Sequence, residues 1–432
     1  MSIAGGATKS RLTPNQVRGF WAAWAGWALD GMDSFIFALI LVPSLRELLP
    51  KSGVAPTGGN IGFWGGLLFA LFLIGWGLSF LWGPLADRFG RVRTLMFTIL
   101  CYSVFTLAGA LSIRVWQLGL FRLLAGIGIG GEWTLGGILV AEEWPEERRV
   151  LGGSLMHTGY YVGTLIASLA NYWIGTRFGW RAMFILGGTP ALLVAFIRYG
   201  VAEPVKWKVH THKLGARLSA RLAFLELFSN EYRGRTILNG IYVLVSMVGL
   251  WAGSVYVPSA VTQLAARQGY SVQYATRLAS IGSVLLSIGT IAGCLLVPAM
   301  ARFVGRRSIL AFFYLFMAMS ILFSFGYVFY LPAQAALWFI VCLFFLGVGG
   351  ASFCVFTIWL PEQYPTECRA SAFAFATSFG RFIAAGATFM VGAAISHYGT
   401  LGRPVTVTGL VFIIGLILVP FGAETRGKAL PD

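Results

Sequence analysis

The chain has 432 residues, of which 57% are hydrophobic and 15% aromatic, while only 11% are charged. This composition is far from that of a soluble domain and indicates a membrane protein. The formal net charge of +16 does not indicate nucleic-acid binding, because the basic residues fall in short clusters between long apolar runs rather than in one patch.

Apolar runs of bilayer-spanning length recur along the chain, and each predicts a helix. The first sixteen residues are polar and the first run carries acids, so no cleavable signal peptide is expected. The sequence predicts an all-α membrane protein with twelve transmembrane helices, over residues 19–42, 61–82, 94–112, 116–141, 151–175, 181–200, 236–257, 276–300, 308–330, 333–360, 371–396 and 404–422.

The distribution of Lys and Arg predicts the orientation, since cytoplasmic loops carry the excess of positive charge. With both termini on the cytoplasmic side, 22 basic residues fall on that side and eight on the other. We therefore expect a multi-pass protein of the bacterial inner (plasma) membrane, with both termini cytoplasmic.

Two pairs of similar segments indicate an internal repeat. "AEEWPEERR" (141–149) aligns with "PEQYPTECR" (361–369) at an offset of 220 residues, and "GPLADRFGR" (83–91) aligns with "PAMARFVGR" (298–306) at an offset of 215. These offsets are about half the chain, which predicts two six-helix parallel repeats that rock about a central site. The predicted divisions are an N-terminal lobe (1–200), a linker (201–235) and a C-terminal lobe (236–432).

The linker contains a basic amphipathic pattern. In "KLGARLSARLAFLEL", which begins at Lys213, leucines recur at helical spacing beside Lys213, Arg217 and Arg221. This pattern predicts a helix that lies at the level of the lipid headgroups, with membrane lipids as its partners. A regulatory or partner-binding role is the alternative.

Several motifs resemble those of one family. "GPLADRFGRVR" is similar to the loop between the second and third helices of the major facilitator superfamily, and "FRLLAGIGIGG" to its fourth-helix motif. "LDGMD", "GGEW" and "SFGRF" together resemble the proton-coupled organic-acid carriers of the sialate and aromatic-acid symporter groups. The resemblance implies the major facilitator fold, alternating access and a monomer.

Five charged residues fall inside predicted helices, namely Asp30, Asp33, Arg122, Glu132 and Arg381. Each costs roughly 2.5 to 3.5 kcal/mol at mid-bilayer if it is left unpaired, so each must be paired, hydrated or neutralised. Charged residues inside a membrane are for that reason candidates for proton and substrate sites.

The resemblance implies that Asp33 is the proton-coupling carboxylate and that Arg122 is its partner. A nearby cation favours the ionised carboxylate and burial favours the protonated one, so a movement that separates the two can load a proton. A static buried salt bridge is the alternative. Asp30 stands one helical turn from Asp33, and it is either the proton site itself or a hydrogen-bond donor within the helix.

Arg381 has no acid at comparable depth in its own half of the sequence. Its counter-charge must then come from across a central cavity or from the substrate, and a guanidinium binds a carboxylate in a bidentate fork. We expect Arg381 to bind an organic anion that exchanges with Glu132. A permanent salt bridge to Glu132 or Asp30 is the alternative reading.

Other polar side chains complete the predicted sites. His157, Tyr161, Trp251, Trp359 and Ser378 are candidate cavity residues, although a lone histidine in a membrane is commonly a packing residue. Charge pairs at the helix ends are expected to latch the cytoplasmic side, with a purely topological role for these charges as the alternative; the latch residues are Asp87, Arg88, Arg91, Glu142 and Arg149.

No cofactor or metal is expected. The five cysteines lack metal-ligand spacing, and the glycines from Gly126 to Gly131 follow no strand, so they do not predict a phosphate-binding loop. No nucleophile and base stand at helical spacing, which argues against an enzyme. The sequence therefore predicts proton-coupled symport of an organic anion, most simply a mono- or aromatic carboxylate; the alternatives are sugar or polyol uptake, drug efflux and a non-transporting nutrient receptor.

Overall fold

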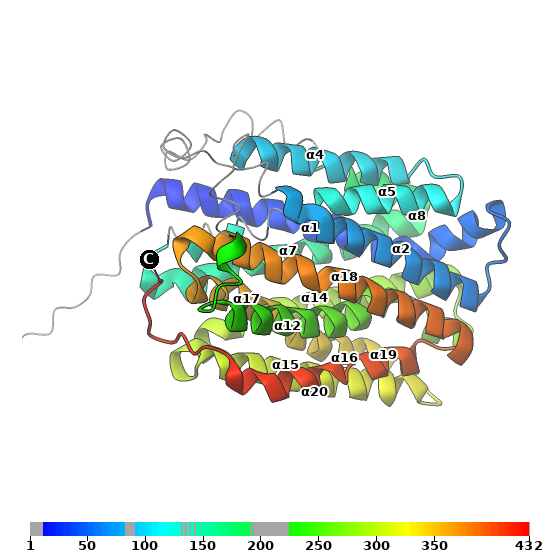
Figure 1. The fold of residues 1–432 in the computed structure, drawn as a ribbon. Coiled ribbons are helices and arrows are strands. Elements are labelled where there is room, and N and C mark those ends of the chain that lie inside the picture. Colours follow the sequence, from blue (N-terminus) through cyan, green and yellow to red (C-terminus); the bar gives the residue numbers. More distant parts are fainter. Residues whose placement is uncertain are drawn as a thin grey trace, which may run out of the picture.

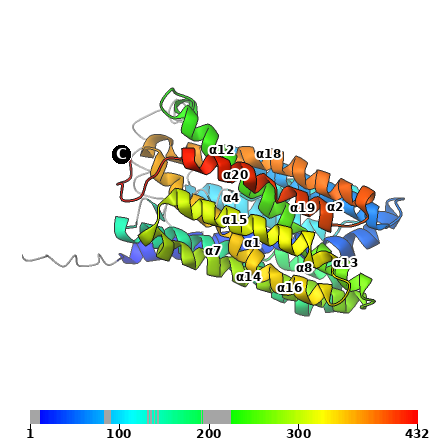
Figure 2. The ribbon, with the colours of Figure 1, turned by 90° about the horizontal axis from the view of Figure 1, so that it is seen from below.

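The computed structural model describes residues 12–82, 91–130, 144–190 and 224–431, together with residues 133, 136, 137, 140, 141 and 192. This part of the chain is helical and contains no strand. Figure 1 shows the helices lying side by side along one direction, and Figure 2 shows the same arrangement after a quarter turn.

The N-terminal half contains six helices in the described residues. They are α1 (Pro14–Lys51), α2 (Gly58–Leu78), α4 (Arg91–Gly109), α5 (Val115–Gly128), α7 (Glu146–Ala170) and α8 (Thr176–Gly187). A 3-10 turn (Ser79–Leu81) continues α2, and one π-helical turn (Asn171–Gly175) joins α7 to α8. Each predicted run of this half coincides with one of these helices, although most residues of the runs after 130 and after 190 lie outside the described residues.

The C-terminal half contains nine helices in the described residues, because some predicted runs are divided. They are α12 (Arg233–Leu250), α13 (Val257–Arg267), α14 (Val272–Phe303), α15 (Arg306–Gly326), α16 (Ala335–Gly350), α17 (Ser352–Trp359), α18 (Thr366–Tyr398), α19 (Gly402–Thr408) and α20 (Val411–Leu418). A second π-helical turn (Trp251–Val255) separates α12 from α13, so the seventh crossing runs well past its predicted end at residue 257. Shorter 3-10 turns lie at Val328–Tyr330, Pro361–Gln363 and Val419–Phe421.

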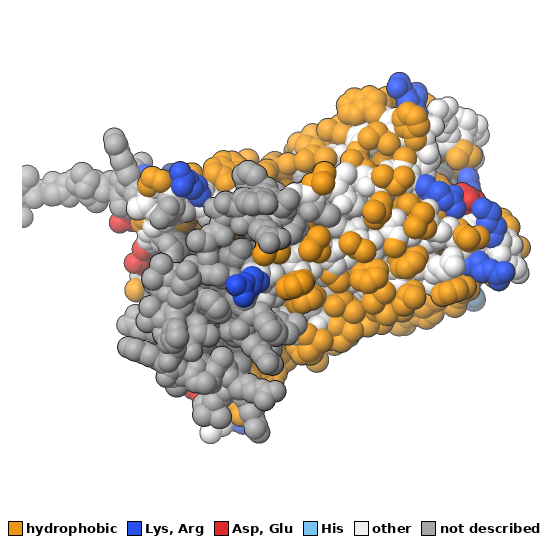
Figure 3. Space-filling view, turned by 90° about the horizontal axis from the view of Figure 1, so that it is seen from above, with side chains coloured by type: hydrophobic (Ala, Val, Ile, Leu, Met, Phe, Trp, Pro, Cys, Tyr) orange, Lys and Arg blue, Asp and Glu red, His pale blue; other side chains and the backbone are white. Residues whose placement is uncertain are grey.

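Seven helical stretches in the described chain are long and apolar enough to cross a membrane. The outward faces of the shorter helices are apolar too: Phe97 on α4, Trp116 on α5 and Ile185 on α8 are each more than half exposed. On the face shown in Figure 3, hydrophobic side chains cover the middle, while Lys and Arg gather toward the ends. So large an exposed apolar surface belongs in lipid.

The described chain begins and finishes at one end of the bundle (Figure 1). We call this end, which holds Pro14 and Pro431, the terminal end, and the opposite end the far end. At the far end Glu47 of α1 holds α8, since Nη1 of Arg181 lies 2.8 Å from Glu47 Oε1 and Nε1 of Trp180 donates to Glu47 Oε2 at 2.8 Å. These bonds hold the part of α1 that continues past its predicted end at residue 42, to Lys51.

Matching pairs of helices pack in the two halves. In the N-terminal half α1 packs on α7 and α2 on α5, while in the C-terminal half α12 packs on α18 and α14 on α16. In each half, therefore, the first crossing pairs with the fifth and the second with the fourth, as a parallel repeat requires. The predicted linker lies mostly outside the described residues, so its bounds and its amphipathic helix at 213–225 remain predictions.

Two seams join the halves. Along one seam α2 packs against α18, and along the other α7 packs against α14 and α17. The second seam is polar: Asn171 donates to Ser280 at 3.0 Å, and the hydroxyls of Thr164 and Ser287 lie 2.8 Å apart. The central cavity lies between these two seams.

Candidate functional site

The central cavity is lined by side chains from both halves. The space between these side chains amounts to about 760 Å³, including the part that opens to solvent. α1, α2 and α7 contribute from the N-terminal half, and α12, the π-helical turn after it, α14, α17 and α18 from the C-terminal half. Four predicted substrate residues line it: His157, Tyr161, Trp251 and Arg381.

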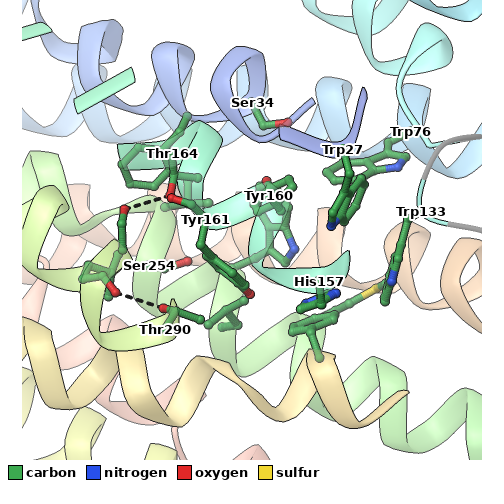
Figure 4. A pocket seen from close by; sticks show the side chains of 18 of the residues that line it. Trp27, Ser34, Trp76, Trp133, His157, Tyr160, Tyr161, Thr164, Ser254 and Thr290 are labelled. Carbon is green, nitrogen blue, oxygen red and sulfur yellow. Dashed lines mark hydrogen bonds between the residues drawn. The ribbon is translucent and has the colours of Figure 1, made fainter. Parts of the chain in front are cut away.

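The cavity has an aromatic end and a hydroxyl end. Figure 4 shows Trp27, Trp76 and Trp133 gathered at one end, and Thr164, Ser254 and Thr290 at the other. Trp27 stacks on Trp133, with ring centroids 5.6 Å apart and planes inclined by 19°. The sequence analysis missed these tryptophans, although Trp27 stands one turn before Asp30 and Trp133 directly follows Glu132.

Arg381 projects from α18 into the aromatic end, and only 3% of it is exposed. Its guanidinium carbon lies 4.2 Å from the ring centroid of Trp76 and 5.8 Å from that of Trp133. Nη1 donates to the carbonyl of Thr377 in the preceding turn, whereas buried Nε has no hydrogen-bond partner among the described residues. The guanidinium is thus held by aromatic faces while part of its donor edge stays unused.

Asp33 and Arg122 form the predicted pair. Both side chains are fully buried, and Arg122 Nη1 lies 3.7 Å from Asp33 Oδ2. Arg122 Nη2 donates to Thr106 at 2.6 Å, and the rings of Phe37 and Phe184 flank the guanidinium at 5.3 and 4.9 Å. Neither Asp33 nor Arg122 lines the central cavity, so this pair lies inside the N-terminal half.

Asp30 takes a different direction from Asp33. It is fully buried and lies, with Tyr160, within electrostatic range of Arg381. Asp30 is thus an acid of the other half within electrostatic range of Arg381, as one alternative of the sequence analysis supposed. Glu132, the other acid considered, lies outside the described residues.

His157 links the halves through one hydroxyl. Its Nδ1 lies 3.1 Å from Thr357 Oγ1, which also accepts a hydrogen bond from Trp133 Nε1 at 3.0 Å. Nε2 of His157 is buried without a hydrogen-bond partner in the described chain, and the ring lines the cavity. His157 therefore has a polar atom to offer to a ligand.

Two other predicted cavity residues lie elsewhere. Trp359 is buried near the terminal end, where it stacks on Tyr242 with ring centroids 5.7 Å apart and donates to the carbonyl of Ala423 at 2.8 Å. Ser378 is buried on α18 but is not among the residues that line the cavity.

At the terminal end, the carboxylate of Glu362 contacts arginines of both halves. It accepts two 3.0 Å hydrogen bonds from Arg306 and one of 2.6 Å from Thr425, and Arg149 Nε of α7 lies 3.9 Å from it across the seam. Arg149, a predicted latch residue, thus contacts the other half. Asp87, Arg88 and Glu142 lie outside the described residues, as does the side chain of Arg91.

Glu424 fixes the tail that follows α20. Burial opposes ionisation of its carboxylate, but backbone N–H groups of Arg306, Arg426, Arg307 and Thr425 donate to it and bring its pKa below the usual value. The tail continues to Pro431, whose carbonyl accepts a 2.8 Å hydrogen bond from Arg369. The C-terminal segment is therefore part of the polar network at this end.

A parallel repeat of helices around a central cavity is what the motifs predict, and the chain matches the Major Facilitator Superfamily over residues 23–388. It belongs to this superfamily. The match confirms the predicted all-α, twelve-helix major facilitator fold, and it makes the protein an integral membrane transporter rather than an enzyme.

Known proteins resemble this transporter along most of its length. A probable 4-methylmuconolactone transporter of Cupriavidus pinatubonensis is 27% identical over 429 residues, which cover 97% of this chain and 93% of the relative. The 4-hydroxybenzoate transporter PcaK of Acinetobacter baylyi is 29% identical over 373 residues, covering 79% and 76%. The structure of the proton:xylose symporter XylE of E. coli superposes with a TM-score of 0.74 at 20% identity, covering 96% of this chain and 97% of the other.

Proposed function

We propose that this transporter carries a small organic anion, a mono- or aromatic carboxylate, together with protons, by alternating access to the central cavity. The observation that carries the proposal is the position of Arg381 in the wall of that cavity. A cation buried at this depth is expensive unless it has a partner, and a carboxylate on the substrate supplies one.

The distribution of acids supports this role for Arg381. No Asp or Glu occurs between residues 232 and 361 or between residues 368 and 423, so the helices of its own half offer no acid at its depth. Asp30 of the other half lies within electrostatic range of the guanidinium and can balance it in the absence of substrate. An entering carboxylate can take the place of this internal acid, which links binding to the relative position of the halves.

The rest of the cavity suits an anion with an apolar body. The indole rings at the Arg381 end can stack on a planar ring of the substrate. The hydroxyls of Thr164, Ser254 and Thr290 at the other end can form hydrogen bonds with its polar substituents. The tautomer of His157 whose Nδ1 accepts from Thr357 carries its ring proton on Nε2 and offers a second donor to the carboxylate. Of the relatives named above, PcaK is described as a transporter of 4-hydroxybenzoate, an aromatic carboxylate.

Proton coupling is assigned to Asp33 with Arg122, and to Asp30. The fully buried Asp33–Arg122 pair can take a proton when movement separates it, and Asp30 can take one when the substrate binds Arg381. We further propose a monomer in the inner membrane of a bacterium, with the terminal end cytoplasmic and with the Arg149–Glu362 contact as part of its latch.

Uptake into proteoliposomes tests this proposal. We expect radiolabelled benzoate and 4-hydroxybenzoate to accumulate when the outside is acidic, by up to about tenfold per pH unit for one proton. A monoanion that enters with one proton moves no net charge, so an imposed membrane potential changes this uptake little.

Xylose and protein-free vesicles are the matched controls. Uptake of xylose without uptake of either acid would favour sugar transport and end the anion proposal. Uptake of the acids at a rate independent of the pH gradient would support anion transport but contradict proton coupling.

A further inference from the structure

A second pocket lies at the terminal end, on the C-terminal half alone. It is lined by the first residues of α12, by Gln363 and by the end of the last crossing, Phe421 to Ala423. It shares no lining residue with the central cavity. We call it the headgroup pocket, and the transport proposal makes no use of it.

The headgroup pocket is basic. Arg233 and Arg235 are exposed in its wall, and neither forms an ion pair with a carboxylate of the described chain. A third guanidinium stands beside it, since Arg307 donates to the carbonyl of Pro420 at 2.8 Å, next to Phe421, but this charge is paired, with Nε of Arg307 3.7 Å from Glu424 Oε2. Glu231 is the one acid among the described lining residues, so cations outnumber acids there.

Apolar side chains flank the pocket on its membrane side. Ile237 on α12, Ile417 on α20 and Phe421 are 56%, 63% and 74% exposed, and α12 packs along α20. The pocket therefore lies where the lipid-facing apolar surface gives way to charge. In a bilayer that boundary is the level of the phospholipid headgroups.

We propose that the headgroup pocket binds an anionic phospholipid. Arg233 and Arg235 hold the phosphate, and the acyl chains lie against Ile237, Ile417 and Phe421. Basic pockets between transmembrane helices are suited to such headgroups. The apolar flank selects a lipid over free phosphate, because inorganic phosphate has nothing to place there.

Native mass spectrometry of the purified transporter tests the proposal, with phosphatidylglycerol titrated against phosphatidylcholine. We expect phosphatidylglycerol to bind more tightly, and the double variant R233Q/R235Q to bind it about thirtyfold more weakly, which is about 2 kcal/mol at 1.4 kcal/mol per tenfold. Inorganic phosphate is the competitor, and at equal concentration we expect it to displace no lipid.

The control R177Q/R403Q removes the same charge from exposed positions near the far end. It should leave phosphatidylglycerol affinity within about twofold of wild type, and thermal unfolding of both double variants in detergent should match wild type. Equal binding of the two lipids, equal loss in both double variants, or displacement by phosphate would each overturn the proposal. None of these results depends on which substrate is carried.

Discussion

The two halves of the transporter bury charge in different ways. In the N-terminal half, Arg122 lies 3.7 Å from Asp33, and both side chains are fully buried away from the cavity. In the C-terminal half, Arg381 faces the cavity, packs on Trp76 of the other half, and has no acid from its own half near it. The first arrangement pairs an acid with a base inside one half, whereas the second draws its counter-charge from the other half or from a ligand.

The largest effect should come from breaking the complete pair. Arg122→Gln leaves the buried Asp33 carboxylate without its cation, and removing one partner of a buried pair costs about 3 to 5 kcal/mol. We expect the free energy of unfolding in detergent to fall by about that amount. In the double variant Asp33→Asn/Arg122→Gln no charge remains at this position, so part of the lost unfolding free energy should be recovered. A double variant as unstable as Arg122→Gln would show that the two charges do not stabilise the fold through each other.

The next effect should appear in binding rather than in stability. Arg381→Lys keeps the charge but loses the planar fork, and a hydrogen bond to a charged group is worth about 1.5 to 3 kcal/mol. We expect 4-hydroxybenzoate to bind about ten- to hundredfold more weakly, measured by equilibrium binding, with little change in the unfolding free energy. Arg403→Lys, an exposed control, should bind as wild type does; the same affinity in Arg381→Lys would remove this residue from the site.

A smaller effect should follow from the contact that joins the halves at the terminal end. Arg149→Gln removes the 3.9 Å approach to Glu362 while Arg306 and Thr425 still hold that carboxylate. We expect the population open at this end to rise about fivefold, corresponding to about 1 kcal/mol. Electron–electron distance measurements between labels at Glu147 and Lys428, without the native cysteines, would show it; an unchanged distribution would deny a latch role to Arg149.

The smallest effect concerns a carboxylate outside the membrane. Because the folded pKa of Glu424 is lowered, its ionised form stabilises the tail above the usual carboxyl pKa, and this contribution is lost as the pH falls through the lowered value. The protection of the Arg306 and Arg307 amides, measured as the exchange rate relative to the intrinsic rate at the same pH, should therefore fall in acid. In Glu424→Gln these two amides should already be less protected at neutral pH, and the pH dependence of their protection should be lost. If the variant responds to acid as wild type does, the response belongs to another titrating group.

Much of the fold could be predicted from hydropathy and the repeat, because lipid demands long apolar helices and the two halves share one pattern. The site was harder. Asp30 and Asp33 are three positions apart, which is about 60° around the helix, enough for one to lie near Arg381 and the other to face Arg122. Hydropathy cannot resolve this angle.

The tryptophans of the cavity escaped prediction for a related reason. The chain has 15 Trp, and tryptophan suits the membrane surface as well as an interior. Trp76 and Trp133 became recognisable only when the fold placed them over Arg381. Trp359 shows the converse, since it was a candidate cavity residue whereas its indole N–H donates to the carbonyl of Ala423 in the tail.

The polar seam along α7 determines what exchange between conformations requires. The Asn171–Ser280 and Thr164–Ser287 hydrogen bonds span the halves. Along the opposite seam, Gly392 of α18 lies close to Gly62 of α2. A methyl carbon added to Gly392 would stand 2.5 Å from the carbonyl oxygen of Gly62. Glycine surfaces without side chains can slide past each other. The hydrogen-bonded polar groups of the first seam must instead each form a hydrogen bond with water before the halves separate. Hydration of the polar seam between α7 and α14 is therefore expected to limit the rate of the transport cycle. Slower turnover in heavy water or under osmotic stress would reveal this limit.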